Sequence, residues 1–380
     1  TTQCGLCGNR CLLTVNTFGD NRRFISGNRC ERPLGKGKQQ DIPNMYKWKY
    51  DLFRSLSGGE NRRGRIGIPM ALNTYENLPF WHAFFTRLGF EVVLSPESSR
   101  ELYACGQHTI PSDTVCYPAK LLHGHIMALL EEGVDTIFYP CMSYNFDEHL
   151  SDNHYNCPVV AYYPDLLGVN IPALEDIKYL HPNLGLHRPK DFEKKGAQLL
   201  ETEFGIPKRA SVKAIRKAYA AYEDFRRLVQ KKGEEYISFA RETGRKILVV
   251  AGRPYHMDPE INHGINDLIT SFGFVLVTED ALSYLEGYAP RKVLNQWTFQ
   301  SRMYNAARYV CTQPDMQVVQ LVSFGCGTDA ITTDEMRSIL EDGSKLYTQL
   351  KIDDISNLGA VKIRIRSLMA AIEEHSRRGQ

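Results

Sequence analysis

Short runs of β-branched and other apolar residues alternate with longer amphipathic segments in two separate stretches of this chain. In the first stretch, the runs 65–70 (RIGIPM) and 90–94 (FEVVL) are separated by a helical pattern over 76–88. The same alternation restarts at 246–252 (KILVVAG), which precedes a helical pattern over 261–272. Strand–helix alternation at this spacing is typical of parallel βαβ units. The chain is therefore predicted to be an α/β protein with two Rossmann-like parallel-sheet lobes.

The predicted domain boundaries follow changes in composition. A small cysteine-rich metal-binding module precedes the lobes, and its few apolar residues could hold a hairpin together only around a metal or cluster. The predicted divisions are a four-cysteine metal or iron–sulfur module over 1–50, a first lobe over 65–185, a helical linker over 186–244, and a second lobe with a C-terminal helix over 245–380. A polar connector is predicted over 41–64. Further strands are predicted at 135–139, 158–162, 274–277, 317–322 and 345–350, and further helices at 119–132, 293–308 and 360–374.

The overall charge and the cysteine content restrict the class of protein. The chain has 46 Lys and Arg against 44 Asp and Glu, a net charge of +2, so neither nucleic acid nor a membrane surface is an expected partner. No apolar run approaches the roughly eighteen residues that a spanning helix needs, and the N-terminus has no secretory signal pattern. Ten cysteines in such a chain are expected to be metal ligands or redox groups in a reducing, cytoplasmic compartment. The lack of an initiator Met leads us to expect a processed chain or a fragment of a longer polypeptide.

The first four cysteines form a compact cluster. Cys4, Cys7 and Cys11 have C-x2-C-x3-C spacing, and Cys30 follows the predicted hairpin. Four thiolates at the base of a hairpin suit a tetrahedral site, either structural zinc or a 4Fe-4S cluster. This spacing is similar to that of the cluster-binding lobe at the start of molybdopterin oxidoreductases, whereas zinc ribbons more often have two C-x2-C knuckles. Both metals remain candidates.

The other six cysteines are distributed over the two predicted lobes. Cys141 and Cys326 each follow a predicted strand, one per lobe, and ligands bind at the carboxyl ends of strands in open α/β sheets. We expect the loops that carry Cys141 and Cys326 to face each other. The loop residues that flank Cys116, Cys141 and Cys326 favour a ligand role over that of small buried apolar residues. Cys157 and Cys311, taken alone, fit either role. The full set of candidate cofactor ligands is Cys105, Cys116, Cys141, Cys157, Cys311 and Cys326.

Several linked motifs resemble one family, the activase-related 2-hydroxyacyl-CoA dehydratase-like proteins. Its wider superfamily contains benzoyl-CoA reductases and double-cubane cluster proteins, and its members are often the C-terminal part of an activase fusion. The resemblance extends from Cys4 to about Leu368. The motifs that carry it are 111–120 (PSDTVCYPAK) with Gly124-His125, 139–142 (YPCM), 152–158 (DNHYNCP), and 252–256 (GRPYH) with 262–264 (NHG).

The resemblance implies a cofactor and partners. The family chemistry is ATP-driven delivery of a low-potential electron to an iron–sulfur cluster between two lobes. The cluster would be an 8Fe-9S double cubane, which uses three cysteines per cubane, or a single 4Fe-4S cluster. The implied partners are an ATP-hydrolysing activase, separate or fused upstream, and a small-molecule or acyl-CoA substrate, in an anaerobic setting. A homodimer is compatible with this interpretation.

Two histidines are candidates for proton donors. Reduction of a small substrate consumes protons, so His125 and His256 are the predicted catalytic residues; backbone-bonded, purely structural histidines are the alternative. Arg253 is expected to pair with a substrate or cofactor anion, or with Asp258. Ser112 is expected to hydrogen-bond a cluster sulfide or its own backbone.

Three functions follow from these observations. The favoured one is an ATP-dependent low-potential reductase or reductive dehydratase that receives electrons from an activase. The alternatives are an electron-transfer or scaffold module of a larger activase/dehydratase fusion with a structural zinc at the N-terminus, and a zinc protein with an inert α/β body.

Overall fold

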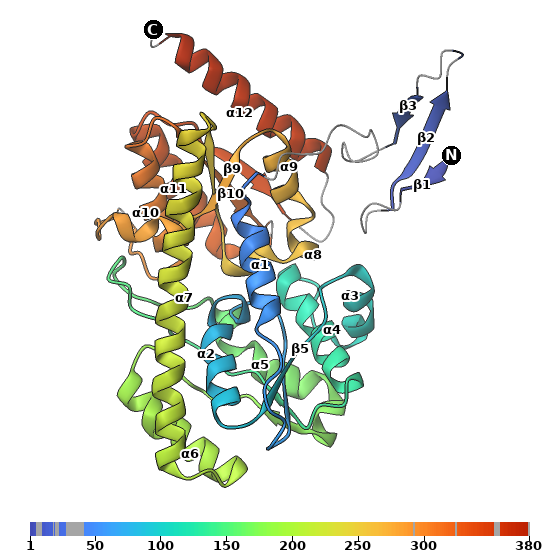
Figure 1. The fold of residues 1–380 in the computed structure, drawn as a ribbon, viewed down its shortest axis with the longest axis vertical. Coiled ribbons are helices and arrows are strands. Elements are labelled where there is room, and N and C mark those ends of the chain that lie inside the picture. The colour runs from blue at the N-terminus through green and yellow to red at the C-terminus, as the bar shows by residue number, and fades with distance from the viewer. Residues whose placement is uncertain are drawn as a thin grey trace.

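The computed structural model describes residues 1–4, 10–17, 19, 23–27, 42–291, 293–323, 325–352 and 358–378. Cys7 and Cys30 lie outside these residues. Within them, the chain forms two parallel-sheet lobes stacked along the long axis of the molecule, and a small antiparallel sheet that stands to one side (Figure 1). The small sheet consists of β1 (Thr2–Gln3), β2 (Leu12–Thr17) and β3 (Arg23–Ser26).

The first lobe is a four-stranded parallel sheet with the strand order β5-β4-β6-β7. Its two central strands are largely buried, as expected for a parallel sheet covered on both faces. The rings of Trp81, Phe85 and Phe138 pack edge to face beneath it. Its elements are β4 (Arg65–Ile68), α2 (Thr74–Arg87), β5 (Glu91–Leu94), α3 (Arg100–Gly106), α4 (Tyr117–Glu131), β6 (Thr136–Phe138), α5 (Pro158–Asn170) and β7 (Lys178–Leu180).

The second lobe repeats this topology. Its sheet has the order β9-β8-β10-β11, so in both lobes the strand order is second, first, third, fourth. This arrangement has a switch point between the first and third strands, where α/β proteins bind ligands. Its elements are β8 (Ile247–Ala251), α8 (Pro259–Asn262), α9 (Ile265–Ser271), β9 (Val275–Thr278), α10 (Thr298–Cys311), β10 (Met316–Val322), α11 (Gly327–Asp342), β11 (Thr348–Lys351) and α12 (Leu358–Arg378), with 3₁₀ turns η4 (Pro254–Met257), η5 (Glu279–Ala281) and η6 (Ser283–Leu285). The two-lobed α/β prediction is confirmed.

Two helices connect the lobes. The helix α7 (Lys208–Glu242) has 35 residues, about 50 Å of helix; it follows α6 (Pro189–Phe204) and extends along both lobes (Figure 1). The helix α1 (Met45–Ser55) lies between them. The backbone of Pro43 accepts a hydrogen bond from Leu276 in β9, whereas that of Gly58 pairs with β5. The chain on either side of α1 thus extends one sheet of each lobe.

Two local predictions were wrong. The run 158–162 was predicted to be a strand because of its β-branched pair, but it is the first part of α5. Pro158 occupies the first turn of that helix, where its fixed φ and missing N–H suit helix initiation. The connector over 41–64 contains α1, whose Met45, Tyr46 and Phe53 are buried in the common core. No helix in the described part of the chain is both long and apolar enough to cross a membrane.

Candidate functional site

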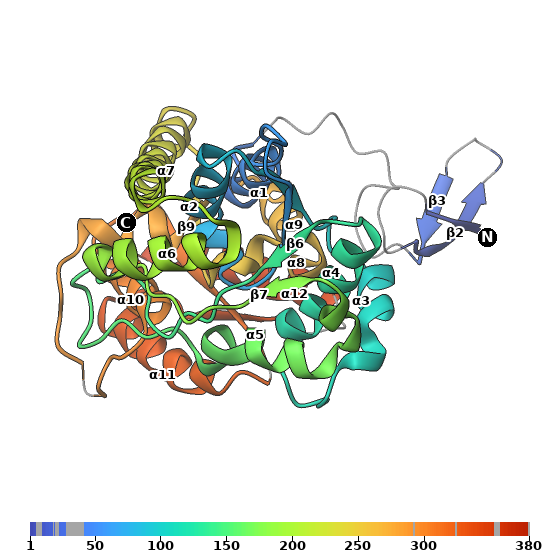
Figure 2. The same ribbon diagram turned by 90° about the horizontal axis from the view of Figure 1, so that it is seen from below.

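Three cysteines occupy the same local position, the residue that begins a helix. Cys116 caps α4, Cys157 caps α5 and Cys326 caps α11, each with extended backbone and no side-chain capping bond. Cys157 and Cys326 are equivalent in the two lobes, since each lies in the loop after the third strand of its sheet. Figure 2 shows α5 and α11 on the side of the molecule opposite α7. The N–H groups and dipole of a helix start favour negative charge, so all three positions suit thiolate or sulfide.

The three thiols come together between the lobes. The thiols lie near enough that an ionised Cys157 or Cys326 would raise the pKa of Cys116, and an ionised Cys326 would raise the pKa of Cys157. All three thiols, when ionised, would also raise the pKa of Tyr255. A Cβ placed on Gly325, next to Cys326, would lie 3.9 Å from the Thr114 carbonyl oxygen, which precedes Cys116 by two residues. The loops that carry the thiols therefore meet across the interface.

Arg253 provides the positive charge of this site. It follows β8, and its Nη2 lies 3.2 Å from the Sγ of Cys326 and 2.8 Å from the Oγ1 of Thr328. The same guanidinium contacts both carboxylate oxygens of Asp329, at 2.6 and 3.2 Å. Arg253 thus pairs with Asp329 and not with Asp258. Burial opposes its charge, but Tyr255, Asp329 and Cys326 together raise its pKa well above the usual value.

Burial controls the ionisation of the thiols. It raises the pKa of Cys116 to about 12 and also raises the pKa of Cys157. At neutral pH these groups are therefore protonated as free thiols, and a bound cation would be needed to convert them to thiolates.

The spacing of the thiols helps to distinguish a single ion from a cluster. Tetrahedral zinc with Zn–S bonds of about 2.3 Å holds its sulfur ligands about 4 Å apart. Among the described residues, only Cys141, Asp165 and His181 form a group of three His, Cys, Asp or Glu ligands whose atoms all lie within 4.8 Å of one another. At least one pair of the sulfurs of Cys116, Cys157 and Cys326 therefore lies more than 4.8 Å apart, which does not suit a single zinc ion bound by all three.

A family model matches this region of the chain. The model is described as CoA enzyme activase uncharacterised domain, and it covers residues 65–282. The chain belongs to this family. Its match includes Cys116, Cys157 and Arg253, whereas Cys326 lies beyond it. No curated protein matches the chain.

The remaining three candidate cysteines of this CoA enzyme activase family member lie in other environments. Cys105 is exposed on α3. Cys141 is buried beside Asp165, in the group mentioned above. The thiol of Cys311, at the end of α10, lies 3.5 Å from the carbonyl oxygen of Ile339. The structure thus brings three of the six together around Arg253.

The two candidate histidines differ in whether a ring nitrogen is left without a hydrogen-bond partner among the described residues. His125 is fully buried, with Ser95 Oγ 2.8 Å from Nδ1 and Ser98 Oγ 3.0 Å from Nε2, and burial lowers its pKa to about 3. His256 follows Arg253 in the chain and accepts a hydrogen bond at Nδ1 from the Arg253 backbone N–H (3.1 Å). Its Nε2 is buried with no hydrogen-bond partner among the described residues. Since Nδ1 accepts, the proton of the neutral ring is on Nε2.

A chain of polar groups continues from His125 into the second lobe. Ser98 donates to Oδ2 of Asp258, and the hydroxyl of Tyr75 donates to the same oxygen. Burial is the main cause that raises the pKa of Asp258 to about 6. Among the described residues, Ser112 makes local bonds to Thr114: its Oγ accepts from the backbone N–H at 3.3 Å and lies 2.8 Å from Oγ1. His125 thus belongs to a buried network that joins the lobes.

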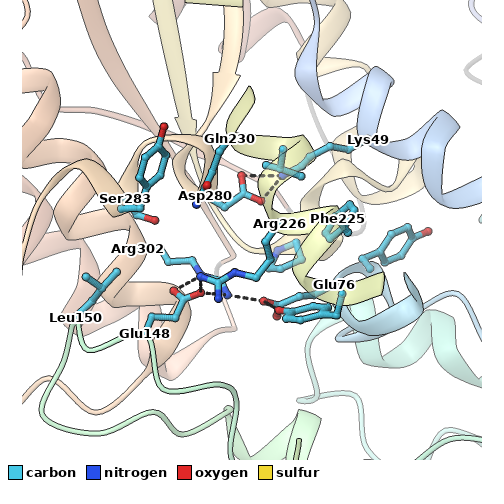
Figure 3. A pocket seen from close by; sticks show the side chains of 15 residues that line it. Lys49, Glu76, Glu148, Leu150, Phe225, Arg226, Gln230, Asp280, Ser283 and Arg302 are labelled. Atoms are coloured by element: carbon cyan, nitrogen blue, oxygen red, sulfur yellow. Dashed lines mark hydrogen bonds and ion pairs between the residues drawn. The ribbon is translucent and has the colours of Figure 1, made fainter. Parts of the chain in front are cut away.

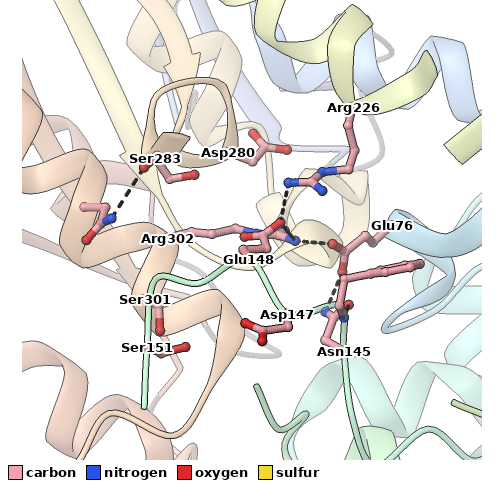
Figure 4. A network of polar contacts seen from close by, with 12 residues as sticks. Glu76, Asn145, Asp147, Glu148, Ser151, Arg226, Asp280, Ser283, Ser301 and Arg302 are labelled. Atoms are coloured by element: carbon pink, nitrogen blue, oxygen red, sulfur yellow. Dashed lines mark hydrogen bonds and ion pairs between the residues drawn. The ribbon is translucent and has the colours of Figure 1, made fainter. Parts of the chain in front are cut away.

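A cavity of about 160 Å³ lies beside α7 (Figure 3). Its charged lining is paired: Lys49 Nζ lies 2.7 Å from Asp280, and Arg302 contacts both Glu76 and Glu148. Figure 4 shows how Arg302, from α10, meets these carboxylates from the first lobe. Arg226 of α7 adds a further contact to Glu148 at 2.9 Å. The cavity therefore lies where buried ion pairs join the two lobes.

Sequence reasoning missed the role of Asp329, Thr328 and Tyr255 in the site. One usable signal was present: Cys157 directly precedes Pro158, and Cys116 precedes Pro118 by two residues. Proline just after a polar residue marks a helix start. The sequence thus carried the information that two of these cysteines cap helices.

Proposed function

We propose that this chain is the iron–sulfur component of a CoA-enzyme activase system, an ATP-dependent low-potential reductase or reductive dehydratase. The observation that carries the proposal is the convergence of Cys116, Cys157 and Cys326, each at a helix start and from both lobes, around Arg253. Thiolates at such positions are suited to iron–sulfur ligation. The family match to a CoA enzyme activase domain supports an activase as the electron-donating partner.

A single 4Fe-4S cluster fits this site better than a double cubane. Three thiols would hold three irons of one cubane and leave the fourth open to substrate or to another ligand. A second cubane would need three more cysteines, but Cys105, Cys141 and Cys311 have the separate environments described above. When bound, such a cluster supplies one-electron redox chemistry at low potential.

The residues around the thiols have separate roles in this proposal. Arg253 and the three helix starts offset the negative charge that accumulates when an electron arrives. His256 is the proton donor, because its unpartnered Nε2–H is buried one turn from Arg253. His125 is saturated by Ser95 and Ser98 and holds the interlobe network in position.

The test is anaerobic iron and sulfide content per chain. Serine at Cys116, Cys157 or Cys326 is expected to remove about four irons from the body of the protein. Cys105→Ser and Cys311→Ser are matched controls that should retain them. Equal iron in all five variants, or equal loss in all five, would overturn the ligand assignment. Iron held by the N-terminal cysteines is common to every variant and cancels in the comparison.

A second experiment tests the electron path. Addition of activase, reductant and ATP should bleach the visible absorption of the wild-type cluster, whereas ADP should not. A cluster that is reduced equally well without ATP would contradict the activase-dependent function while leaving the ligand assignment intact.

An electron-transfer module of a larger fusion is the second candidate. The charges that line the cavity beside α7 are already paired with one another, so they leave few groups free to bind an anionic substrate. This favours a chain that passes electrons to another catalytic unit. Turnover with acyl-CoA substrates in the presence of activase and ATP distinguishes the two, since a module would be reduced without consuming substrate.

The N-terminal cysteines form a separate metal site in this proposal. Cys4 and Cys11 are buried beside Leu13 in the small sheet, and the Cys4 backbone N–H donates to the Cys11 carbonyl oxygen at 2.8 Å. Together with Cys7 and Cys30 they would hold zinc or a 4Fe-4S cluster. Cys7→Ser should release one zinc, or one cluster, while the body stays folded, and unchanged metal content would contradict the assignment.

A further inference from the structure

Cys141, Asp165 and His181 meet at the carboxyl edge of the first sheet. Cys141 follows β6 and His181 directly follows β7, and these strands are neighbours with Phe138 opposite Leu180. The pairing continues beyond the strands, since Cys141 forms a bridge with Asn183. Because adjacent parallel strands end at the same edge, both side chains are brought to one place, a usual ligand-binding edge. Asp165 approaches from α5.

The three side chains present a sulfur, an oxygen and a nitrogen ligand at short range. Their ligand atoms all lie within 4.8 Å of one another, and Asp165 Oδ1 is 2.8 Å from His181 Nδ1. The depth is graded: Cys141 is 1% exposed, whereas the side chains of His181 and Asp165 are 38% and 51% exposed. An ion could therefore enter from solvent and still contact a buried sulfur.

Neighbouring groups fix the orientation of two of the ligands. The ring of Tyr179 stacks on that of His181 with centroids 4.7 Å apart. The hydroxyl of Tyr179 donates to the carbonyl oxygen of Pro164, the residue before Asp165, at 2.8 Å. Gly168 of α5 faces the same two rings, since a Cβ there would lie 3.8 Å from Nε2 of His181. Nδ1 is thus the nitrogen directed at Asp165, and such supporting contacts are typical of metal sites.

We propose that Cys141, Asp165 and His181 form a further metal site, which binds a divalent transition-metal ion, most naturally Zn²⁺. A sulfur–oxygen–nitrogen ligand set is one that zinc accepts, and three protein ligands leave a fourth tetrahedral position for water on the exposed side. Binding releases the thiol proton of Cys141, and the His181 ring proton moves from Nδ1 to Nε2. Thiolate and carboxylate then neutralise the two charges of the ion.

This site is distinct from the three-thiol site and does not depend on its cofactor. The two are mechanically linked through α5, which begins at Cys157 and carries Asp165 two turns later. An ion held by Cys141, Asp165 and His181 would tie that helix to the ends of β6 and β7. It would thereby restrict the movement of α5, whose N-cap residue, Cys157, is one of the three thiols.

The experiment is a cobalt titration of anaerobically iron-loaded full-length protein. Co²⁺ replaces zinc in such sites and gives visible bands with thiolate-to-cobalt absorption. Wild type is expected to bind one more equivalent of Co²⁺ than His181→Ala or Asp165→Asn, with a corresponding loss of the thiolate band. Both substitutions are at partly exposed side chains, and circular dichroism confirms that the variants are folded.

The matched control is His149→Ala. His149 forms a comparable exposed pair with Asp147, with Nδ1 3.2 Å from Oδ2, but no cysteine completes it among the described residues. This variant should bind as much Co²⁺ as wild type. The proposal is overturned if His181→Ala binds the same number of equivalents with the same spectrum as wild type. It is also overturned if His149→Ala and His181→Ala lose cobalt equally.

Discussion

Arg253 and Asp329 form a fully buried ion pair, with Nη2 and Oδ1 2.6 Å apart, and the same Nη2 lies 3.2 Å from the thiol of Cys326. The guanidinium is therefore shared between a carboxylate and a thiol. Asp329 has a second task, because its Oδ2 accepts the backbone N–H of Ser323 at 2.9 Å. The pair ties the strand β8 to the helix that begins at Cys326.

Removing one charge of this pair should lower the free energy of unfolding more than removing both charges. Arg253→Met leaves the Asp329 carboxylate buried and unpaired, and we expect it to lower the free energy of unfolding by about 3–5 kcal/mol. Adding Asp329→Asn removes the orphan charge and keeps an acceptor for Ser323, so the double variant should regain part of the loss. Anaerobic urea unfolding measures both. Additive losses would show that the two side chains are not coupled.

Arg302 should be a major contributor to the joining of the lobes. It contacts Glu76 and Glu148 of the first lobe from α10 of the second. Arg302→Met leaves two buried carboxylates with fewer partners and is expected to cost about 3–5 kcal/mol of unfolding free energy. The control Arg216→Met removes an exposed pair with Glu193 and should have a much smaller effect. Similar urea midpoints for the two variants would argue against a structural role for the network.

Gly252 is predicted to tolerate no side chain. A Cβ there would lie 2.5 Å from Nδ1 of His256 and 3.2 Å from the hydroxyl of Tyr46. Gly252→Ala should therefore displace His256 and cost about 1–3 kcal/mol, whereas Gly287→Ala meets nothing within 4 Å and serves as the control. Thermal unfolding of the two variants tests this, and equal melting temperatures would show that the strand can shift to make room.

Protonation of Glu279 should contribute a stability that falls as the pH rises from 6.5 to 8. Burial, assisted by Asp280, raises the pKa of Glu279 to about 8. The folded state therefore holds a proton that the unfolded state releases near pH 4.5, and the stability this gives is lost as the pH rises through the folded pKa. One such group changes the free energy of unfolding by up to about 1.4 kcal/mol per pH unit.

Glu279→Gln should flatten this slope. The comparison isolates Glu279, because the histidines whose pKa is lowered by burial, such as His125 and His256, titrate alike in the two proteins. Urea unfolding at several pH values measures the difference between wild type and variant. Parallel pH profiles for the two proteins would mean that Glu279 does not titrate in this range.

The sequence predicted the lobes well because the buried strands of a parallel sheet are uniformly apolar. The runs around Ile66 and Leu248 have this character and no competing pattern. The run after Pro158 is the exception, since Val159 and Val160 favour a strand locally. Pro158 at the start of α5 and the burial of Val160 and Tyr163, three residues apart on one face, favour the helix that forms.

The site was harder to predict because it depends on contacts between distant segments. The choice of Arg253 partner could not be decided from sequence, since Asp258 is five residues away and Asp329 is brought near only by the pairing of β8 with β10. Likewise, nothing local indicates that Ser95 and Ser98 occupy both nitrogens of His125. Cysteines were easy to select as candidates, but their grouping required the fold.

The origin of the three helix-start thiols in both lobes also sets an order of events during synthesis. Cys116 and Cys157 emerge from the ribosome well before Cys326, and their own sheet can form without it. Any group that needs all three sulfurs must wait until the second lobe has folded against the first. Assembly of such a group would therefore follow the folding of both lobes, and a nascent or truncated first lobe would present two of the sulfurs without the third.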